Sequence, residues 1–332
     1  MTSAVIIVLR EVLEAVLIIC MLLASSSALG LRFRWLPPAL LAGLAGALIY
    51  AVFLEDISMA FEGFGQEIVN AVLLLLITLL LLAHNILAMR EFKAPQIARL
   101  PALSLLILSA TIAMAIVREG SEIYLYVYSY GVVAGDMASV LAGGAIGTGI
   151  GFSLGTFIYY GLRTLSARHC LLFSSIMALI IGAGMSSQAA LFLAQADLVP
   201  AAEPLWDTSA LVAESSLMGE LLQAVIGYEA SPIAAQVGMF AGALLLSLVA
   251  MAIGLVVILA ASTVLLNFEG TLLLVSHDRD FLDAVAQRVV EQALASQQVG
   301  VEPLERRVGH AALTSRVVAV PPRRGGAAGQ AH

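Results

Sequence analysis

The chain is poor in charge, and lysine is almost absent from it. Only 12% of its 332 residues are charged and Lys93 is the single lysine, whereas soluble domains carry about 25% charged residues. The net charge of -7 argues against nucleic acid as a partner, because binding to phosphates needs a basic surface. The two cysteines, Cys20 and Cys170, are too few for a disulfide framework or a zinc pattern, so we expect them to be buried and reduced.

Long apolar runs replace the missing charge, and 61% of the residues are hydrophobic. A helix of about 20 apolar residues crosses a bilayer. The first run could pass for a signal peptide, but no basic residue precedes it and charges interrupt it, which indicates a retained span. The sequence thus predicts an all-α polytopic membrane protein with seven transmembrane helices, at 3–25, 36–54, 67–89, 102–130, 138–161, 170–194 and 236–264.

Basic residues occur only in alternate loops. Cytoplasmic loops are enriched in lysine and arginine, so this alternation predicts the orientation of the chain. The protein is expected in the inner membrane of the cell. Its N-terminus is expected outside and its C-terminus in the cytoplasm. Lysine or arginine occurs in loops 31–35, 90–100 and 162–169, and neither occurs in 55–66, 131–137 or 195–235.

A charged pentapeptide occurs twice inside the apolar runs. The first motif is Arg10-Glu11-Val12-Leu13-Glu14 in span one, and the second motif is Arg118-Glu119-Gly120-Ser121-Glu122 in span four. Each such charge near a bilayer centre costs roughly 2.5–3.5 kcal/mol, unless it meets a partner. Because each motif opens a triplet of spans and the triplets start on opposite sides, the pattern predicts a 3+3 inverted repeat plus one helix.

The motif carboxylates are suited to binding a cation. Glutamates three residues apart share a helix face, so Glu11 projects with Glu14, and Glu119 with Glu122. An all-oxygen, anionic site favours hard cations, of which ferric iron is among the hardest. Arg10 and Arg118 are supporting residues that can reach a neighbouring helix or the other motif. The alternative is a set of inter-helix salt bridges without a ligand.

Further segments carry a family resemblance together with the two motifs. They are Phe61-Glu62-Gly63, Pro204-Leu205-Trp206-Asp207-Thr208-Ser209 and Gly227-Tyr228-Glu229-Ala230-Ser231-Pro232. Over about residues 1–266, the chain resembles the oxidase-dependent, high-affinity iron permease family, also called the iron/lead transporter family.

The resemblance implies uptake of ferric iron across the cytoplasmic membrane by a transporter, not an enzyme. Iron is then the transported substrate, and no cofactor is bound permanently. Its implied ligands are Glu11, Glu14, Glu119 and Glu122, with Glu62 as a weaker candidate. The implied partner is an extracytoplasmic iron oxidase or iron-delivery protein. Glu67 and the Glu55-Asp56 pair are expected to attract cations without acting as fixed ligands.

Three structural expectations concern the remaining polar, small and loop residues. Small residues at fourfold spacing in spans two and five are expected to form packing seams, at Gly43 and Ala47 and at Gly143, Gly147, Gly151 and Gly155. His84 is expected to be a hydrogen-bonded packing residue. In loop 195–235, Asp207 or Thr208 is expected to cap a helix running to about Ile226, with Leu211, Met218, Leu222 and Val225 along one face.

The residues after span seven no longer form a long apolar run. Segment 267–292 resembles the switch-histidine segment of duplicated ABC ATPases, but the chain has no G-x-x-x-x-G-K-[ST] loop, so we expect no ATPase activity. Residues 293–332 are expected to be disordered.

Two other functions stay open for the 1–266 domain. One is transport of another cation or solute with the carboxylates as a proton relay. The other is an intramembrane di-iron carboxylate enzyme, although such bundles use Glu-x-x-His motifs, which the chain lacks.

Overall fold

The computed structural model describes residues 2–93, 101–133, 135–200, 202–214 and 216–266, which contain helices and no strand. The predicted segments 267–292 and 293–332 lie outside the described residues. The long helices are α1 (Thr2–Ala28), α2 (Leu36–Val52), α4 (Gly65–Lys93), α6 (Pro101–Tyr126), α7 (Met137–Arg163), α8 (Ala167–Gln195) and α10 (Ala234–Leu266). The short elements are η1 (Phe33–Trp35), α3 (Leu54–Met59), η2 (Phe61–Gly63), the π-helix η3 (Val127–Val133) and α9 (Leu217–Ile226).

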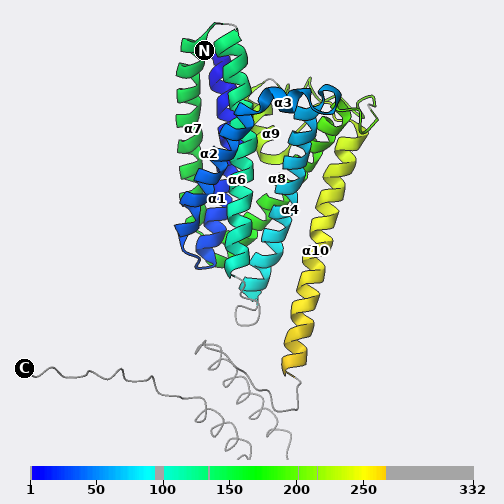
Figure 1. Cartoon of the computed structure of the whole chain (residues 1–332). Coiled ribbons are helices and arrows are strands. Elements are labelled where there is room, and N and C mark those ends of the chain that lie inside the picture. Colours follow the sequence, from blue (N-terminus) through cyan, green and yellow to red (C-terminus); the bar gives the residue numbers. More distant parts are fainter. Residues whose placement is uncertain (1, 94–100, 134, 201, 215, 267–332) are drawn as a thin grey trace, which may run out of the picture. The chain divides into compact units, whose positions relative to one another are not determined.

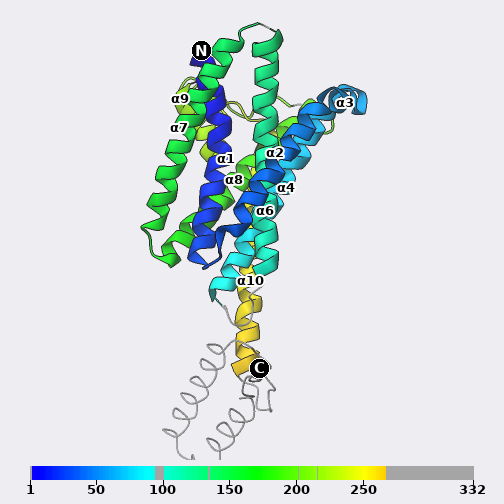
Figure 2. The ribbon, with the colours of Figure 1, turned by 60° about the vertical axis from the view of Figure 1, so that its left-hand side comes forward.

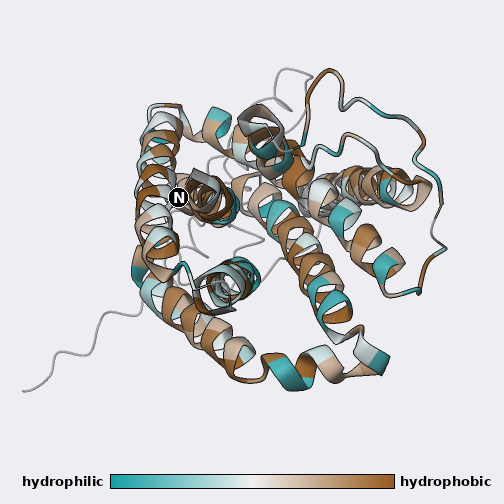
Figure 3. Ribbon diagram, turned by 90° about the horizontal axis from the view of Figure 1, so that it is seen from above, coloured by the Kyte–Doolittle hydropathy of each residue, from teal (hydrophilic) through white to brown (hydrophobic). Residues whose placement is uncertain are grey.

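Six helical segments of the described chain are long and apolar enough to cross a membrane, so the protein is an all-α, multi-pass membrane protein. Hydrophobic residues cover most of the helices in Figure 3. Helix α1 has 27 residues, or about 40 Å at 1.5 Å per residue, but it contains the first motif and is not one of the six. The count of seven spans therefore stays a prediction. The six segments are Phe33–Val52, Gly65–Arg90, Ala102–Val132, Met137–Arg163, Ala167–Gln195 and Ala234–Val257.

The two predicted triplets are α1, α2 and α4, and α6, α7 and α8. Each helix of one triplet packs mainly against a helix of the other. Helix α1 packs along α7, and α2 packs along α6, so each motif helix lies against the second long helix of the other triplet. Helix α4 packs against α8, and α10 contacts both (Figures 1 and 2). The two motif helices, α1 and α6, also touch each other and run in opposite directions (Figure 1).

Glycines allow the close approach of α7 to α1. A Cβ atom at Gly147 would stand 2.7 Å from the Val5 carbonyl oxygen and 3.4 Å from the Val8 Cβ. One turn further, a Cβ at Gly151 would stand 2.6 Å from Val12 Cγ1. The fourfold glycine spacing in α7 therefore forms the packing seam expected from the sequence.

The same contact recurs between α2 and α6. A Cβ at Gly43 would stand 3.0 Å from the Ala113 carbonyl oxygen and 2.7 Å from the Ile116 Cβ. In the second motif helix, Ala113 and Ile116 hold the places that Val5 and Val8 hold in the first, counted from each motif's arginine. This correspondence, with antiparallel α1 and α6, is the arrangement that an inverted repeat produces.

The glycine seam supplies a stability prediction. Gly151→Leu should destabilise the folded chain by about 1–3 kcal/mol, because its side chain would have to displace Val12 in a tightly packed seam. The matched control is Gly149→Leu on the same helix, where an added Cβ meets no atom within 4 Å. Thermal unfolding of the detergent-solubilised variants measures the difference. Equal melting temperatures would show that the seam tolerates a side chain.

The two cysteines and His84 are buried near the C-terminal half of α1, as the sequence predicts. Both cysteines are buried and free, and the Cys20 thiol donates to the Gly155 carbonyl oxygen at 3.1 Å. His84 is buried in α4, and its Nε2 lies 3.1 Å from the Ser25 hydroxyl. The histidine thus has the hydrogen-bonded packing role that the sequence predicts.

Candidate functional site

The four motif glutamates converge on one guanidinium. Nη1 of Arg118 lies 2.7 Å from Glu119 Oε2 and 3.0 Å from Glu14 Oε2, and it donates a hydrogen bond to each. The same nitrogen is 3.6 Å from Glu11 Oε2, and Nη2 is 3.8 Å from Glu122 Oε1. Helices α1 and α6 therefore bring the four motif glutamates together, and Arg118 lies at their centre.

This cluster lies almost entirely inside the protein. Arg118, Glu11, Glu14 and Glu119 are between 1% and 6% exposed. Taking so many charges out of water costs several kcal/mol per ion after relaxation, unless each is paired. Pairing is incomplete, because the buried atoms Glu11 Oε2 and Glu119 Oε1 accept no hydrogen bond from the described residues. The cluster thus contains two buried carboxylate oxygens without hydrogen bonds in the described part of the chain, of which Glu11 Oε2 lies 3.6 Å from Arg118 Nη1.

Arg10 has a different role from its counterpart in the second motif. Its guanidinium donates to Glu11 within its own motif and, at 3.2 Å, to Glu220 Oε2 of α9. Its side chain is 26% exposed, compared with 7% for Arg118. Arg10 therefore connects the first motif to the short helix that packs on α1 and α8, while Arg118 holds the glutamates together.

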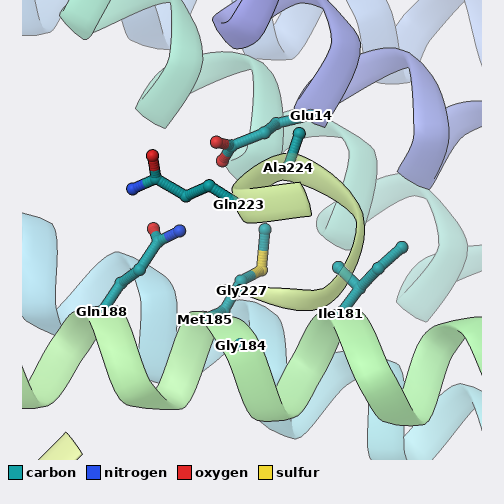
Figure 4. Close-up of a pocket in the computed structure, with 8 residues that line it drawn as sticks. All are labelled: Glu14, Ile181, Gly184, Met185, Gln188, Gln223, Ala224 and Gly227. Atoms are coloured by element: carbon teal, nitrogen blue, oxygen red, sulfur yellow. The ribbon is translucent and has the colours of Figure 1, made fainter. Parts of the chain in front are cut away.

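Helix α8 completes the cluster. Nη2 of Arg118 donates to Gln188 Oε1 at 3.2 Å. A pocket beside the cluster is lined by Glu14 of α1, Gln188 and Met185 of α8, and Gln223 of α9, among others. In Figure 4, the polar ends of Glu14, Gln188 and Gln223 gather on one side of this pocket. The carboxylate cluster thus borders a small pocket that is lined by polar residues and by apolar ones such as Ile181 and Ala224.

Helix α9 begins later than the sequence predicts. Ser216, not Asp207 or Thr208, caps it by accepting a hydrogen bond from the Gly219 amide at 3.0 Å. Thr208 instead bonds across the loop to the Tyr228 hydroxyl and the Ala230 carbonyl oxygen. The expected cap was wrong because residues 204–214 pair with residues 228–232 and leave only Leu217–Ile226 for the helix.

The apolar face predicted for this helix was right for Val225 and wrong for Leu211 and Met218. Leu211 lies outside the helix and is 85% exposed, and Met218 is 59% exposed. The residues of α9 that pack against the hydrophobic core are Leu221, Ala224 and Val225. Gly227 ends the helix at a φ of 66°, and a Cβ at Gly184 of α8 would lie 2.8 Å from its Cα. This backbone contact holds α9 on α8, over the cluster.

The other acidic candidates lie apart from the cluster. Glu62 is exposed in η2 with a φ of 62°, and none of the ion pairs found in the described ranges includes it. Glu55 and Asp56 are exposed in the first turn of α3. Where residues are described, no three acidic, histidine or cysteine side chains are arranged so that they could hold one metal ion. The motif acids instead meet around Arg118.

Sequence reasoning missed two members of the site. Gln188 follows Ser186 and Ser187 in an otherwise apolar run of span six, and this polar break was the available signal. Glu220 is an acidic residue of segment 195–235. Its pairing with Arg10 depends on where α9 packs, and nothing in its local sequence specifies that position.

The loop between α8 and α10 contains a second group of neighbouring acidic residues, Glu214 and Glu229. Glu214 Oε1 accepts a hydrogen bond from the Ala230 amide at 2.8 Å. Burial, together with the charge and hydrogen bonding of Glu214, raises the pKa of Glu229 to about 7. The charge of this loop therefore changes close to neutral pH.

Comparison with known proteins identifies one family. A model described as the Iron permease FTR1 family matches residues 97–268, more than half of the chain. The matched range contains the second motif and both loop segments that carry the resemblance noted from the sequence, whereas the first motif precedes it. No curated protein and no solved structure matches the chain.

Proposed function

The chain belongs to the Iron permease FTR1 family, and on that premise we propose that it carries ferric iron into the cell through the motif carboxylates. The family assignment makes the protein an iron permease of the membrane, which agrees with its multi-pass fold. The proposal adds the oxidation state of iron, the ligands and the direction. Iron is the transported substrate in this account, and no resident cofactor is needed.

The observation that carries the proposal is the convergence of Glu11, Glu14, Glu119 and Glu122 from two helices onto Arg118. Neighbouring carboxylates repel one another and need a cation to remain ionised together. Here the guanidinium keeps them in one place without saturating their oxygens. Carboxylate oxygens are hard ligands, and their preference for a small, highly charged ion favours Fe(III) over softer metals.

The distribution of charge supports the direction of transport. The loops without basic residues, which carry Glu62, Glu55 and Asp56, would face outside under the positive-inside rule. Acidic residues there would raise the local concentration of cations before they enter the membrane. In this orientation, the N-terminus is outside, the C-terminus is cytoplasmic, and an extracytoplasmic oxidase or iron-delivery protein supplies Fe(III). Glu62 serves this supply as an outer, weaker ligand.

Uptake of radioactive iron tests the function directly. Cells or proteoliposomes containing the full chain should accumulate iron supplied as a soluble Fe(III) chelate, and a membrane-impermeant reductant should lower the rate. Faster uptake with the reductant would overturn the ferric assignment. Absence of iron uptake together with proton-coupled movement of another solute would favour the relay alternative, and turnover of an oxidisable substrate would favour the di-iron enzyme.

A further inference from the structure

Three buried oxygens lie without hydrogen-bond partners near one end of the bundle. They are the Tyr50 hydroxyl of α2, Glu67 Oε2 of α4 and Asn70 Oδ1 of α4. Tyr50 is 5% exposed and Asn70 is 4% exposed. Glu67 and Asn70 are three residues apart in the first two turns of α4, and therefore project from the same face. These atoms come from helices that both pack against the second motif helix, α6.

The α2–α6 contact brings Tyr50 to the second motif. A Cβ at Gly120, inside that motif, would lie 2.9 Å from Ala47 Cβ. Tyr50 follows Ala47 by three residues on α2, so it faces α6 one turn beyond Gly120. The charges of Glu122 and Glu67 both act on the Tyr50 hydroxyl. Tyr50 therefore lies within electrostatic reach of two carboxylates, one from α4 and one from α6.

Leaving these oxygens unsatisfied is costly. A buried polar group without a partner costs about 1–3 kcal/mol, and more when it is charged. Three such groups in one part of a folded protein call for an explanation by a ligand, since nearly all buried polar atoms are otherwise paired. All three atoms are oxygens with free lone pairs, which are ligands for a hard cation.

We propose that Tyr50, Glu67, Asn70 and Glu122 form a second cation-binding station on the outer side of the Arg118 cluster. The station takes a hard multivalent cation through carboxylate, amide and phenol oxygens. The proposal rests on the proposed function for its role, because an ion entering from outside would bind here first. Glu122 belongs to both sites, since its Oε1 is 3.8 Å from Arg118 Nη2 while its side chain remains 24% exposed.

Terbium luminescence can test the station without any assumption about iron. Tb³⁺ is a hard, trivalent ion that prefers oxygen ligands, and it emits when a nearby tyrosine is excited. Titration of TbCl₃ into the full chain in lipid nanodiscs should give saturable emission. Tyr50→Phe should remove most of this emission while keeping the ring that packs against α6. Glu67→Gln should weaken Tb³⁺ binding by about 10–100-fold, the range seen when a supporting group of a metal site is lost.

Matched controls separate the station from general attraction of cations. Tyr160→Phe removes a tyrosine that is 61% exposed on α7, and Glu203→Gln removes an exposed acid of the loop after α8. Both controls should bind Tb³⁺ and emit like the unaltered protein. Circular dichroism of each variant establishes that it is folded. Unchanged emission in Tyr50→Phe and unchanged affinity in Glu67→Gln would overturn the station.

The outcomes distinguish the station from the function proposed above. If the unaltered chain takes up iron and terbium binding is the same in Tyr50→Phe and Glu67→Gln, the proposed permease function stands and the second cation site is refuted. Terbium binding that depends on Tyr50 and Glu67, in a protein that takes up no iron, would leave a cation site and remove the proposed function. In Glu14→Gln, terbium emission should persist, because Glu14 belongs to the Arg118 cluster only.

Discussion

Arg118→Gln should lower the stability of the folded chain by about 3–5 kcal/mol, the cost of removing one partner from a buried ionic group. Arg118 is the one residue that pairs with all four motif glutamates within the described ranges. Glutamine can still donate a hydrogen bond, but it brings no positive charge. The glutamates would then repel one another in a region of low dielectric, and α1 would be pushed away from α6.

Fluorescence-detected size-exclusion chromatography after heating measures this effect on the full chain. Arg163→Gln is the control, because Arg163 is exposed at the end of α7 and interacts only weakly with the Tyr159 ring at 5.9 Å. Acidification should narrow the gap between Arg118→Gln and the unaltered protein, since protonated glutamates no longer repel. Equal thermal stability of Arg118→Gln and Arg163→Gln would show that the cluster does not hold the two motif helices together.

Glu14→Gln should reduce iron uptake by at least about 10–100-fold, the loss that follows removal of groups supporting a metal site. Glu14 is 5% exposed, accepts a hydrogen bond from Arg118, and lines the pocket beneath α9. Glutamine has the same shape and can accept the same bond, so the substitution removes the charge and leaves the packing. The predicted change is therefore in transport and not in folding.

Radio-iron uptake, normalised to the amount of protein in the membrane, measures the transport loss. Glu122→Gln should show a similar loss because Glu122 shares the cluster, and Glu203→Gln should transport normally because its side chain is exposed in the loop after α8. Normal uptake by both Glu14→Gln and Glu122→Gln would refute their assignment as ligands.

The sequence predicts the helices well because membrane spans are encoded locally. Long apolar runs end at charged, proline or glycine residues, which mark the ends of the spans. For example, the span predicted at 170–194 corresponds to α8, Ala167–Gln195. The repeat was also readable, since two copies of one motif in opposite spans constrain the topology. The sequence also indicated that Arg118 could reach the other motif, and in the structure it donates to Glu14.

The side-chain contacts of the site and the start of α9 could not be predicted from local sequence. Which arginine enters the cluster depends on tertiary packing: Arg10 and Arg118 have equivalent places in their motifs, yet only Arg10 has Glu220 of α9 within reach. The cap of α9 was misplaced because Asp207 accepts from the Ser209 amide in a local turn. An Asp or Thr before an apolar stretch favours a helix start and a turn alike, and only the surrounding chain decides between them.

The central position of Arg118 has a consequence for electrostatics during transport. If iron binds at the motif carboxylates as proposed, the incoming ion would meet oxygens that Arg118 already contacts. Iron and the guanidinium would then compete for the same ligands. If the guanidinium withdrew as the ion bound, the summed charge of the low-dielectric cluster would change by less than when an empty anionic site is filled. A guanidinium that cannot lose its proton would be well suited to this exchange, because it could pair with the same carboxylates again once the ion had left.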